Sequence, residues 1–255
     1  MSHYKRFTVL GINHNTLDFM RLLVASVRKF STSSFEIIIL DNDSTDGSKE
    51  WLLEHPDIMA IHSSTNIGHG LGLDQAFPFV RTPYTCVLDI DCHVQRSGWD
   101  EAFWSAYTRN PKTRLVAVHG GVGNELKPIH PFFMWFETSF FRQHNFKFAP
   151  GNGWDVGRAL YGRILGLGYD VIRILPSYEP DGSKFYPGVF GTEYYFDGKP
   201  TIYHNWYSGR MAGLRSGDDV DGYKFEEFSA HKELLFNQPL VHEILGDKTR
   251  EDQQS

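Results

Sequence analysis

The sequence predicts an α/β fold: a single domain with a mostly parallel sheet flanked by helices. Short apolar runs alternate with segments whose apolar residues recur at helical spacing, and this is typical of parallel strands covered on both faces. The 255 residues contain no internal repeat and no low-complexity linker, and their length suits one large domain. We therefore expect one core rather than two independent units.

The alternation is clearest in the first half of the chain. Four apolar runs are predicted strands: Phe7–Ile12, Phe35–Leu40, Ile58–His62 and Tyr84–Leu88. The predicted helices between them are Thr16–Phe30, Ser48–Glu54 and Leu71–Val80. Because strands and helices follow one another at these intervals, the strands are expected to run parallel.

The second half of the chain is less regular. Its predicted helices are Asp100–Arg109, Trp154–Leu167 and Tyr223–Phe236. Its predicted strands are Arg114–Val118, Pro131–Glu137 and Val171–Leu175. Ser177–Pro200 is rich in Gly, Pro and aromatic residues and is predicted as a long loop or lid. Ser208–Gly222 is Gly-rich and is predicted to be mobile.

Composition argues against several classes of protein. The formal net charge is −6 and no Lys/Arg block occurs, which argues against a nucleic-acid partner. The two cysteines, Cys86 and Cys92, are separated by extended chain and are not expected to form a disulfide, which fits a reducing compartment. No apolar stretch approaches the length needed to span a bilayer. We expect a soluble, cytoplasmic protein.

The acidic pair Asp89 and Asp91 is the strongest chemical signal. It follows an apolar strand in the run Val87–His93 (VLDIDCH), at the strand end where open α/β sheets bind ligands. If the chain stays extended there, both carboxylates point to the same side. Paired carboxylates suit Mg²⁺ or Mn²⁺, which can bridge a diphosphate. An isolated pair of this kind is more often a solvated turn, so the rest of the chain decides.

Two further polar segments follow predicted strands. Asp41, in Ile38–Ser48 (IILDNDSTDGS), is placed to accept hydrogen bonds from a nucleobase edge, while Asp43 or Ser44 could cap the next helix. The segment Asn66–Phe77 (NIGHGLGLDQAF) has glycines that permit close backbone approach to a ligand before a helix N-terminus. Its spacing differs from the dinucleotide fingerprint, so alone it is a weak signal.

Together these segments resemble the family 2 glycosyltransferases, which have the GT-A fold. The motifs that carry the resemblance are LDNDSTDGS (Leu40–Ser48), NIGHGLG (Asn66–Gly72) and DID (Asp89–Asp91). The resemblance implies transfer of a hexosyl or deoxyhexosyl unit, with inversion, from a nucleoside-diphosphate sugar to a hydroxyl acceptor such as a glycan or lipid-linked glycan. The implied donor contacts are Asn13, Asp41, Asn66, Gly68, Gly70, Asp89 and Arg210.

The resemblance also implies a divalent cation and a general base. Mn²⁺ or Mg²⁺ would be held by Asp89, Asp91 and His204, of which the histidine follows a strand-like run. The base on the acceptor hydroxyl is expected to be Asp155 or Glu137, with Glu193 as a third candidate. Residues 1–120 would form the donor-binding half, residues 121–245 the acceptor-binding half, and residues 246–255 a flexible tail.

Three other functions remain open from the residues alone. A sugar nucleotidyltransferase would share the fold but usually carries basic residues after the first strand, where this chain has Gly11–Asn15 (GINHN). A nucleotide-sugar or glycan-binding module would bind without turnover. A metal hydrolase built on Asp and His would act on phosphoesters without any sugar donor.

Overall fold

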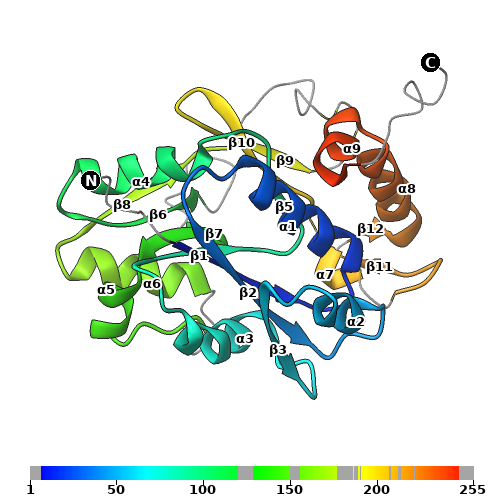
Figure 1. The fold of residues 1–255 in the computed structure, drawn as a ribbon, viewed down its shortest axis with the longest axis horizontal. Helices are drawn as coiled ribbons and strands as arrows, with labels where there is room; N and C mark the ends of the chain where they lie inside the picture. Colours follow the sequence, from blue (N-terminus) through cyan, green and yellow to red (C-terminus); the bar gives the residue numbers. More distant parts are fainter. Residues whose placement is uncertain are drawn as a thin grey trace.

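A seven-stranded sheet forms the centre of the molecule, in the strand order β3-β2-β1-β4-β7-β6-β8 (Figure 1). The structure is a computed structural model. It describes residues 7–119, 129–149, 156–176, 186, 189, 191–206, 208–211, 214–220 and 222–246. The strands are β1 (Phe7–Asn13), β2 (Phe35–Asn42), β3 (Ile58–Ser63), β4 (Tyr84–Leu88), β6 (Thr113–His119), β7 (Ile129–Glu137) and β8 (Asp170–Ile174).

The first four strands of this sheet are parallel, as predicted. β1 pairs in parallel with β2 and β4, and β2 pairs in parallel with β3. β7 lies antiparallel to both β4 and β6, and β6 pairs in parallel with β8. The sheet is therefore mixed but mostly parallel, and every residue of β1 is buried. The parallel pairing brings the carboxyl ends of β1, β2, β3 and β4 to one edge.

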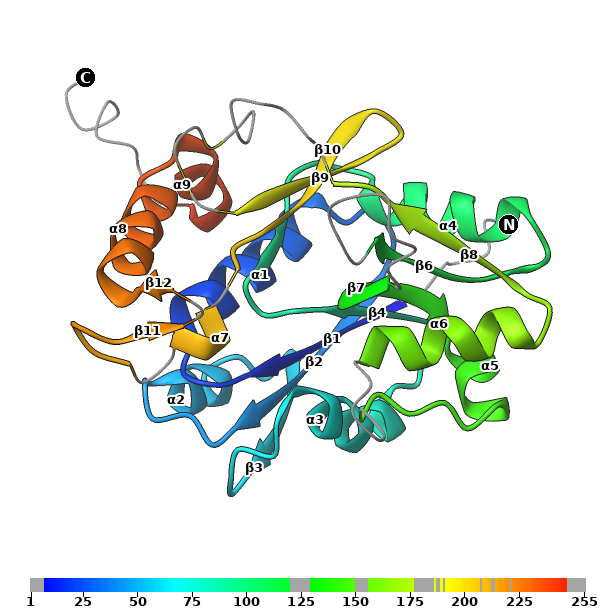
Figure 2. The same ribbon diagram turned by 180° about the vertical axis from the view of Figure 1, so that it is seen from behind.

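Helices cover both faces of the sheet because its side chains alternate between two apolar clusters. One face packs against α1 (Leu17–Phe30), α2 (Ser48–Leu53), α4 (Trp99–Arg109), α8 (Phe225–Phe236) and α9 (Pro239–Leu245). The other face packs against α3 (His69–Ala76), the 3₁₀ turn Phe77–Phe79, α5 (Thr138–Gln143) and α6 (Val156–Gly166). Figure 2 shows α8 and α9 beside α1, at the opposite end of the molecule from α5 and α6.

A second sheet of three strands covers part of the α1 face. It has the order β5-β10-β9, formed by β5 (Cys92–Val94), β9 (Thr192–Phe196) and β10 (Lys199–His204). All of its pairings are antiparallel, with Cys92 opposite His204. This sheet joins residues just after the acidic pair to residues more than a hundred positions later in the chain.

The prediction of a loop in this second half is wrong, and several elements were not predicted. Ser177–Pro200 was expected to be a loop, but it contains β9 and the first residues of β10, because Thr192–Phe196 (TEYYF) forms a hairpin strand with β10. Ser208–Gly222 contains the short helix α7 (Ser208–Met211) and the strand β11 (Asp219–Val220), which pairs with β12 (Tyr223–Lys224). The elements β5, α5 and α9 were not predicted.

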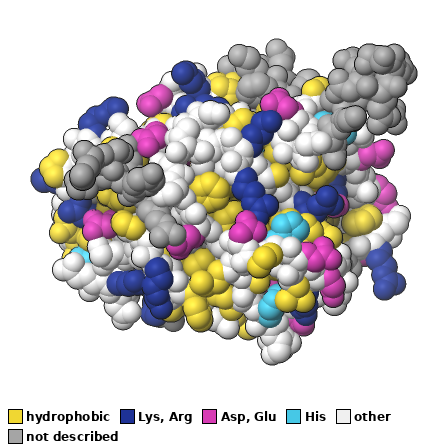
Figure 3. Space-filling model, in the orientation of Figure 1, with side chains coloured by type: hydrophobic (Ala, Val, Ile, Leu, Met, Phe, Trp, Pro, Cys, Tyr) yellow, Lys and Arg dark blue, Asp and Glu magenta, His cyan; other side chains and the backbone are white. Residues whose placement is uncertain are grey.

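The described surface carries charges of both signs. On the described part of the face in Figure 3, Lys and Arg side chains are scattered among acidic ones and do not form a continuous stripe. Both cysteines are free and buried. Among the described helices, none is both long and apolar enough to cross a membrane.

Candidate donor site at the carboxyl edge of the sheet

Polar side chains gather where the four parallel strands end. Asn13, Asp41 and Asn42 close β1 and β2, and Asp89 follows β4 directly. All of these strands run in the same direction, so their polar ends share one edge. Ligands of open α/β sheets bind at this edge.

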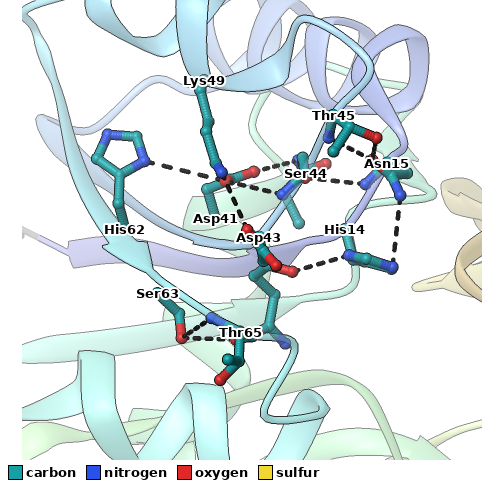
Figure 4. A network of polar contacts seen from close by, with 12 residues as sticks. His14, Asn15, Asp41, Asp43, Ser44, Thr45, Lys49, His62, Ser63 and Thr65 are labelled. Atoms are coloured by element: carbon teal, nitrogen blue, oxygen red, sulfur yellow. Dashed lines mark hydrogen bonds and ion pairs between the residues drawn. The ribbon is translucent and has the colours of Figure 1, made fainter.

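Asp41 is fully buried and is held by the end of β1 and the loop after β2 (Figure 4). The Asn13 amide donates to Asp41 Oδ1 and to Ser44 Oγ, each at 3.0 Å. The Ser44 backbone N–H donates to Asp41 Oδ2 at 3.2 Å. His62 Nδ1 lies 3.9 Å from the same oxygen. The network fixes the carboxylate. Asn13, which was expected to contact the sugar donor, uses its amide N–H groups to hold Asp41 and Ser44.

Asn42 fixes the start of α3 in the same way. Its side-chain amide donates to Asn66 Oδ1 at 3.0 Å, and its Oδ1 accepts the Ile67 backbone N–H at 3.0 Å. Gly68 precedes the helix with φ of 83°, a left-handed value that favours glycine. Gly70 is buried inside the first turn. These contacts direct the N-terminus of α3 toward the carboxyl edge.

The acidic pair lies in a turn, which corrects the expectation of an extended chain. β4 ends at Leu88, and the Cys92 backbone N–H donates to the Asp89 carbonyl at 3.0 Å, closing the turn. The two carboxylates therefore contact different elements. Asp89 Oδ1 lies 3.3 Å from His69 Nε2 at the start of α3. Asp91 faces the end of β10.

Asp91 is buried in contact with His204 and Ser208. Its Oδ1 lies 3.2 Å from His204 Nε2, and its Oδ2 accepts a 2.7 Å hydrogen bond from Ser208 Oγ at the start of α7. Burial acts to raise the pKa of Asp91, but His204 and the Ser208 hydroxyl outweigh it, so the pKa lies below its usual value. His204 stacks on Phe132 and packs against Trp206, with ring centroids 4.2 and 4.1 Å apart.

These residues fit a divalent cation. Among the described residues, one group offers three close ligand atoms, from Asp91, Cys92 and His204, all within 4.8 Å of one another. Asp89 Oδ1 and His204 Nδ1 are buried and have no hydrogen-bond partner. Carboxylate and imidazole ligands suit Mn²⁺. The structure thus brings together two of the three predicted ligands, Asp91 and His204, while Asp89 faces His69 beside them.

Sequence reasoning missed His69 and Ser208, which line this site, whereas it placed His130 near the acceptor. His69 and Ser208 contact the two carboxylates as described above. His130 lies beside Trp206, with ring centroids 5.2 Å apart, and burial lowers its pKa to about 4. One signal was available for His69, since it stands between two glycines at a predicted helix start. For Ser208 only the tertiary fold supplies the contact.

The acceptor-side predictions have different outcomes. Glu137 pairs with Tyr84 in the register of β4 and β7, at the opposite end of β4 from Asp89 and about 16 Å of strand away. Its carboxylate accepts a hydrogen bond from Ser139. The structure therefore does not bring Glu137 to the site. Glu193 is buried in β9 and accepts a 2.9 Å hydrogen bond from Gln95.

The two remaining predicted residues lie in the second half of the chain. Arg210 lies exposed in α7, two positions after Ser208. Its backbone is therefore near the Asp91 contact. Asp155 lies outside the described residues, immediately before α6.

The fold is similar to that of several solved structures, among them a mannosyltransferase. The mannosyltransferase PcManGT from Pyrobaculum calidifontis, in complex with GDP-Man and Mn²⁺, aligns over 96% of this chain and 74% of its own, with TM-score 0.55 and 16% identity. S. aureus TarS 1-349 in complex with UDP-GlcNAc aligns over 94% and 70%, with TM-score 0.55 and 14% identity. Across five such structures the chain spans 35% to 74% of the matched chain, and less than two thirds of it in two.

The family comparison covers more than half of the chain. Comparison with curated proteins gives no match. The family model described as Glycosyl transferase family 2 matches residues 8–161, a range that runs from β1 through the acidic pair to the first turns of α6. On this match, together with the shared fold, the chain belongs to glycosyl transferase family 2.

Proposed function

We propose that the protein is a metal-dependent, inverting glycosyltransferase that moves a hexosyl or deoxyhexosyl unit from a nucleoside-diphosphate sugar to an acceptor hydroxyl. One observation carries this proposal. The Asp91–His204–Ser208 cluster and Asp89 Oδ1, which faces His69 without a hydrogen bond, lie on the same sheet edge as the Asp41 network. A cation site and a nucleobase site side by side suit a nucleoside diphosphate.

The donor would lie along this edge. Asp41, held by Asn13 and Ser44, would accept hydrogen bonds from the nucleobase. The N-terminus of α3, with Asn66, Gly68 and Gly70, would face the ribose or phosphates. Asp91 and His204 would hold Mn²⁺ or Mg²⁺ together with Asp89. When bound, the cation supplies positive charge that stabilises the departing diphosphate.

The second half of the chain would supply the acceptor side. We propose Asp155, immediately before α6, as the general base that takes the proton of the acceptor hydroxyl. Arg210 would neutralise the leaving diphosphate from α7. Trp206 and His130 lie beside His204 and would line the acceptor groove. Residues 1–120 would thus bind most of the donor and residues 121–245 the acceptor, with His204 and Arg210 of the second part reaching the cation and the diphosphate.

A transfer assay with defined donors tests the proposal. The chain is incubated with UDP-GlcNAc or GDP-mannose, whose complexes with the two structural relatives suggest them as first choices, and release of UDP or GDP is measured with Mn²⁺, Mg²⁺ or EDTA. We expect release with Mn²⁺ and its loss in EDTA. Undiminished turnover in EDTA would remove the metal from the mechanism.

The base assignment has its own test. Asp155→Asn should abolish transfer and leave donor binding, measured by calorimetry with Mn²⁺, nearly unchanged, because the base contacts the acceptor rather than the donor. Glu137→Gln is the matched control, since this carboxylate lies at the far end of β4. Near-normal transfer by Asp155→Asn would contradict the assignment.

A further inference from the structure

Cys92 lies in the same cluster as the two proposed cation ligands. Its Sγ and one ligand atom each of Asp91 and His204 all lie within 4.8 Å of one another. Cys92 and His204 are directly opposite in the antiparallel register of β5 and β10, so their side chains share a face of that small sheet. The thiol is buried, with 1% of the residue exposed.

An independent observation points to a ligand at this position. His204 is 3% exposed, and its Nδ1 is buried without a hydrogen-bond partner. Its other ring nitrogen faces Asp91 at 3.2 Å. Both nitrogens of a buried imidazole are normally hydrogen-bonded, so Nδ1 without a hydrogen bond indicates that His204 can bind a ligand. Nitrogen, oxygen and sulfur ligand atoms thus lie within 4.8 Å of one another on three buried residues.

The other cysteine provides the contrast. Cys86 is equally buried, in the middle of β4, where its Sγ donates to the Val87 carbonyl at 4.0 Å. Among the described residues, Cys86 belongs to no group of potential ligands. The two thiols therefore share burial and differ in their neighbours.

We infer that Cys92 is a third protein ligand of the proposed cation site and makes that site prefer Zn²⁺ or Co²⁺ to Mg²⁺. The inference rests on the proposed function, because Asp91 and His204 serve both. Thiolate ligands favour softer cations, whereas Mg²⁺ prefers oxygen ligands and near-octahedral geometry. On binding, the thiol loses its proton to solvent and a metal–sulfur bond forms. The Asp91 carboxylate and the thiolate together balance the two positive charges.

Cobalt spectroscopy tests this directly. The whole chain is titrated with Co²⁺, and absorption is followed for the near-ultraviolet sulfur-to-cobalt charge-transfer band and for the visible bands of the bound ion. Wild type and Cys86→Ala should show both. Cys92→Ala should lose the charge-transfer band and bind Zn²⁺ more weakly by at least the ~10–100-fold that loss of an outer-shell partner of a ligand costs, with Mg²⁺ affinity unchanged.

The outcomes separate the inference from the proposed function. Co²⁺ bound by the wild type without a charge-transfer band overturns the role of Cys92 and leaves the cation site standing. A wild-type chain that binds no divalent cation, and that transfers sugar in EDTA, removes the metal from both. If Cys92→Ala fails to fold, X-ray absorption of the Co²⁺-loaded wild type decides, because a ligating sulfur would lie at about 2.3 Å.

Discussion

Two carboxylates lie at opposite edges of the main sheet and differ in how their oxygens are used. Asp100, at the start of α4, lies at the amino edge and is 1% exposed. Both of its oxygens accept hydrogen bonds from the loop before β2, including the Ser33 backbone N–H at 2.7 Å and the Thr32 hydroxyl at 3.1 Å. Asp89, at the carboxyl edge, has an Oδ1 that is buried without a hydrogen-bond partner.

The difference separates a carboxylate whose oxygens both hold the fold from one that has an oxygen without a hydrogen bond, as the proposed cation site requires. Buried polar atoms are nearly always hydrogen-bonded, so an unsatisfied one calls for an explanation. Asp100 ties α4 to the segment between α1 and β2 through both of its oxygens. Asp89 lies 3.3 Å from His69 and Asp91 lies 3.2 Å from His204. The proposed cation would bind carboxylate oxygens of both aspartates.

The largest expected effect comes from Asp91→Asn. The amide keeps the shape of the side chain but loses the charge that would hold the cation beside the diphosphate. We expect kcat/KM for transfer to fall by about 10²–10³-fold, the range seen when one group that stabilises the transition-state charge is removed. Steady-state kinetics with Mn²⁺ measures this. A change below about tenfold in that assay would place Asp91 outside the reaction.

The second effect concerns His93, a buried imidazole that follows the acidic turn. Its Nε2 bonds to the Tyr186 hydroxyl at 2.7 Å, and burial lowers the pKa of His93 to about 3. As the pH falls below about 6.5, the unfolded chain takes up a proton that the folded chain does not. The contribution to stability is therefore complete above about pH 6.5 and decreases toward pH 3.

His93→Gln tests this contribution. Between about pH 6.5 and pH 4 the wild type should lose about 3 kcal/mol of unfolding free energy that the variant does not lose, at about 1.4 kcal/mol per pH unit. Urea denaturation at pH 7 and pH 4 measures it. The control is His55→Gln, which removes a partly exposed imidazole after α2. Parallel pH dependence of wild type and His93→Gln would show that His93 also protonates in the folded protein.

The two halves of the chain differ in how far the sequence predicts them. In the first half, each βαβ unit pairs strands that are close in the sequence. The local pattern of apolar residues is therefore enough to predict which strands are neighbours. β5 and β10 pair across more than a hundred residues, and a three-residue run such as Cys92–Val94 has too few positions to show a period. β9 was not predicted because the Gly and Pro residues around it are typical of loops.

The same distinction applies to the site. Asp41 and Asn66 follow local motifs and take the expected places at the carboxyl edge. The geometry of Asp89 and Asp91 was predicted wrongly. Three residues, Asp89-Ile90-Asp91, are too few for their sequence to distinguish an extended strand from a tight turn. Ser208 is 117 positions from Asp91, and no local pattern marks that contact.

The third effect tests the amino edge. Asp100→Asn replaces one acceptor oxygen with a donor that faces the Thr32 and Ser33 donors. We expect the free energy of unfolding to fall by about 1–3 kcal/mol, the usual result of leaving a buried group unsatisfied. Transfer per folded molecule should stay near wild type, because Asp100 lies at the far edge of the sheet. Denaturation and kinetics on the same preparation, beside Asp91→Asn, measure both effects. If Asp100→Asn lost transfer activity but kept its stability, Asp100 would act in the reaction rather than in holding the fold.

The smallest effect concerns how closely α3 approaches the sheet. A Cβ at Gly72 would lie 3.1 Å from the Ile12 side chain, whereas a Cβ at Gly162 in α6 meets nothing within 4 Å. Alanine favours a helix by about 0.5–1 kcal/mol over glycine, so Gly162→Ala should raise the unfolding free energy by that amount. At Gly72 overpacking of about 1–3 kcal/mol opposes this gain. We therefore expect Gly72→Ala to lower stability by about 1 kcal/mol in urea denaturation. Equal stabilisation by both substitutions would show that α3 can move away from β1, and that the position of His69 beside Asp89 does not depend on this close packing.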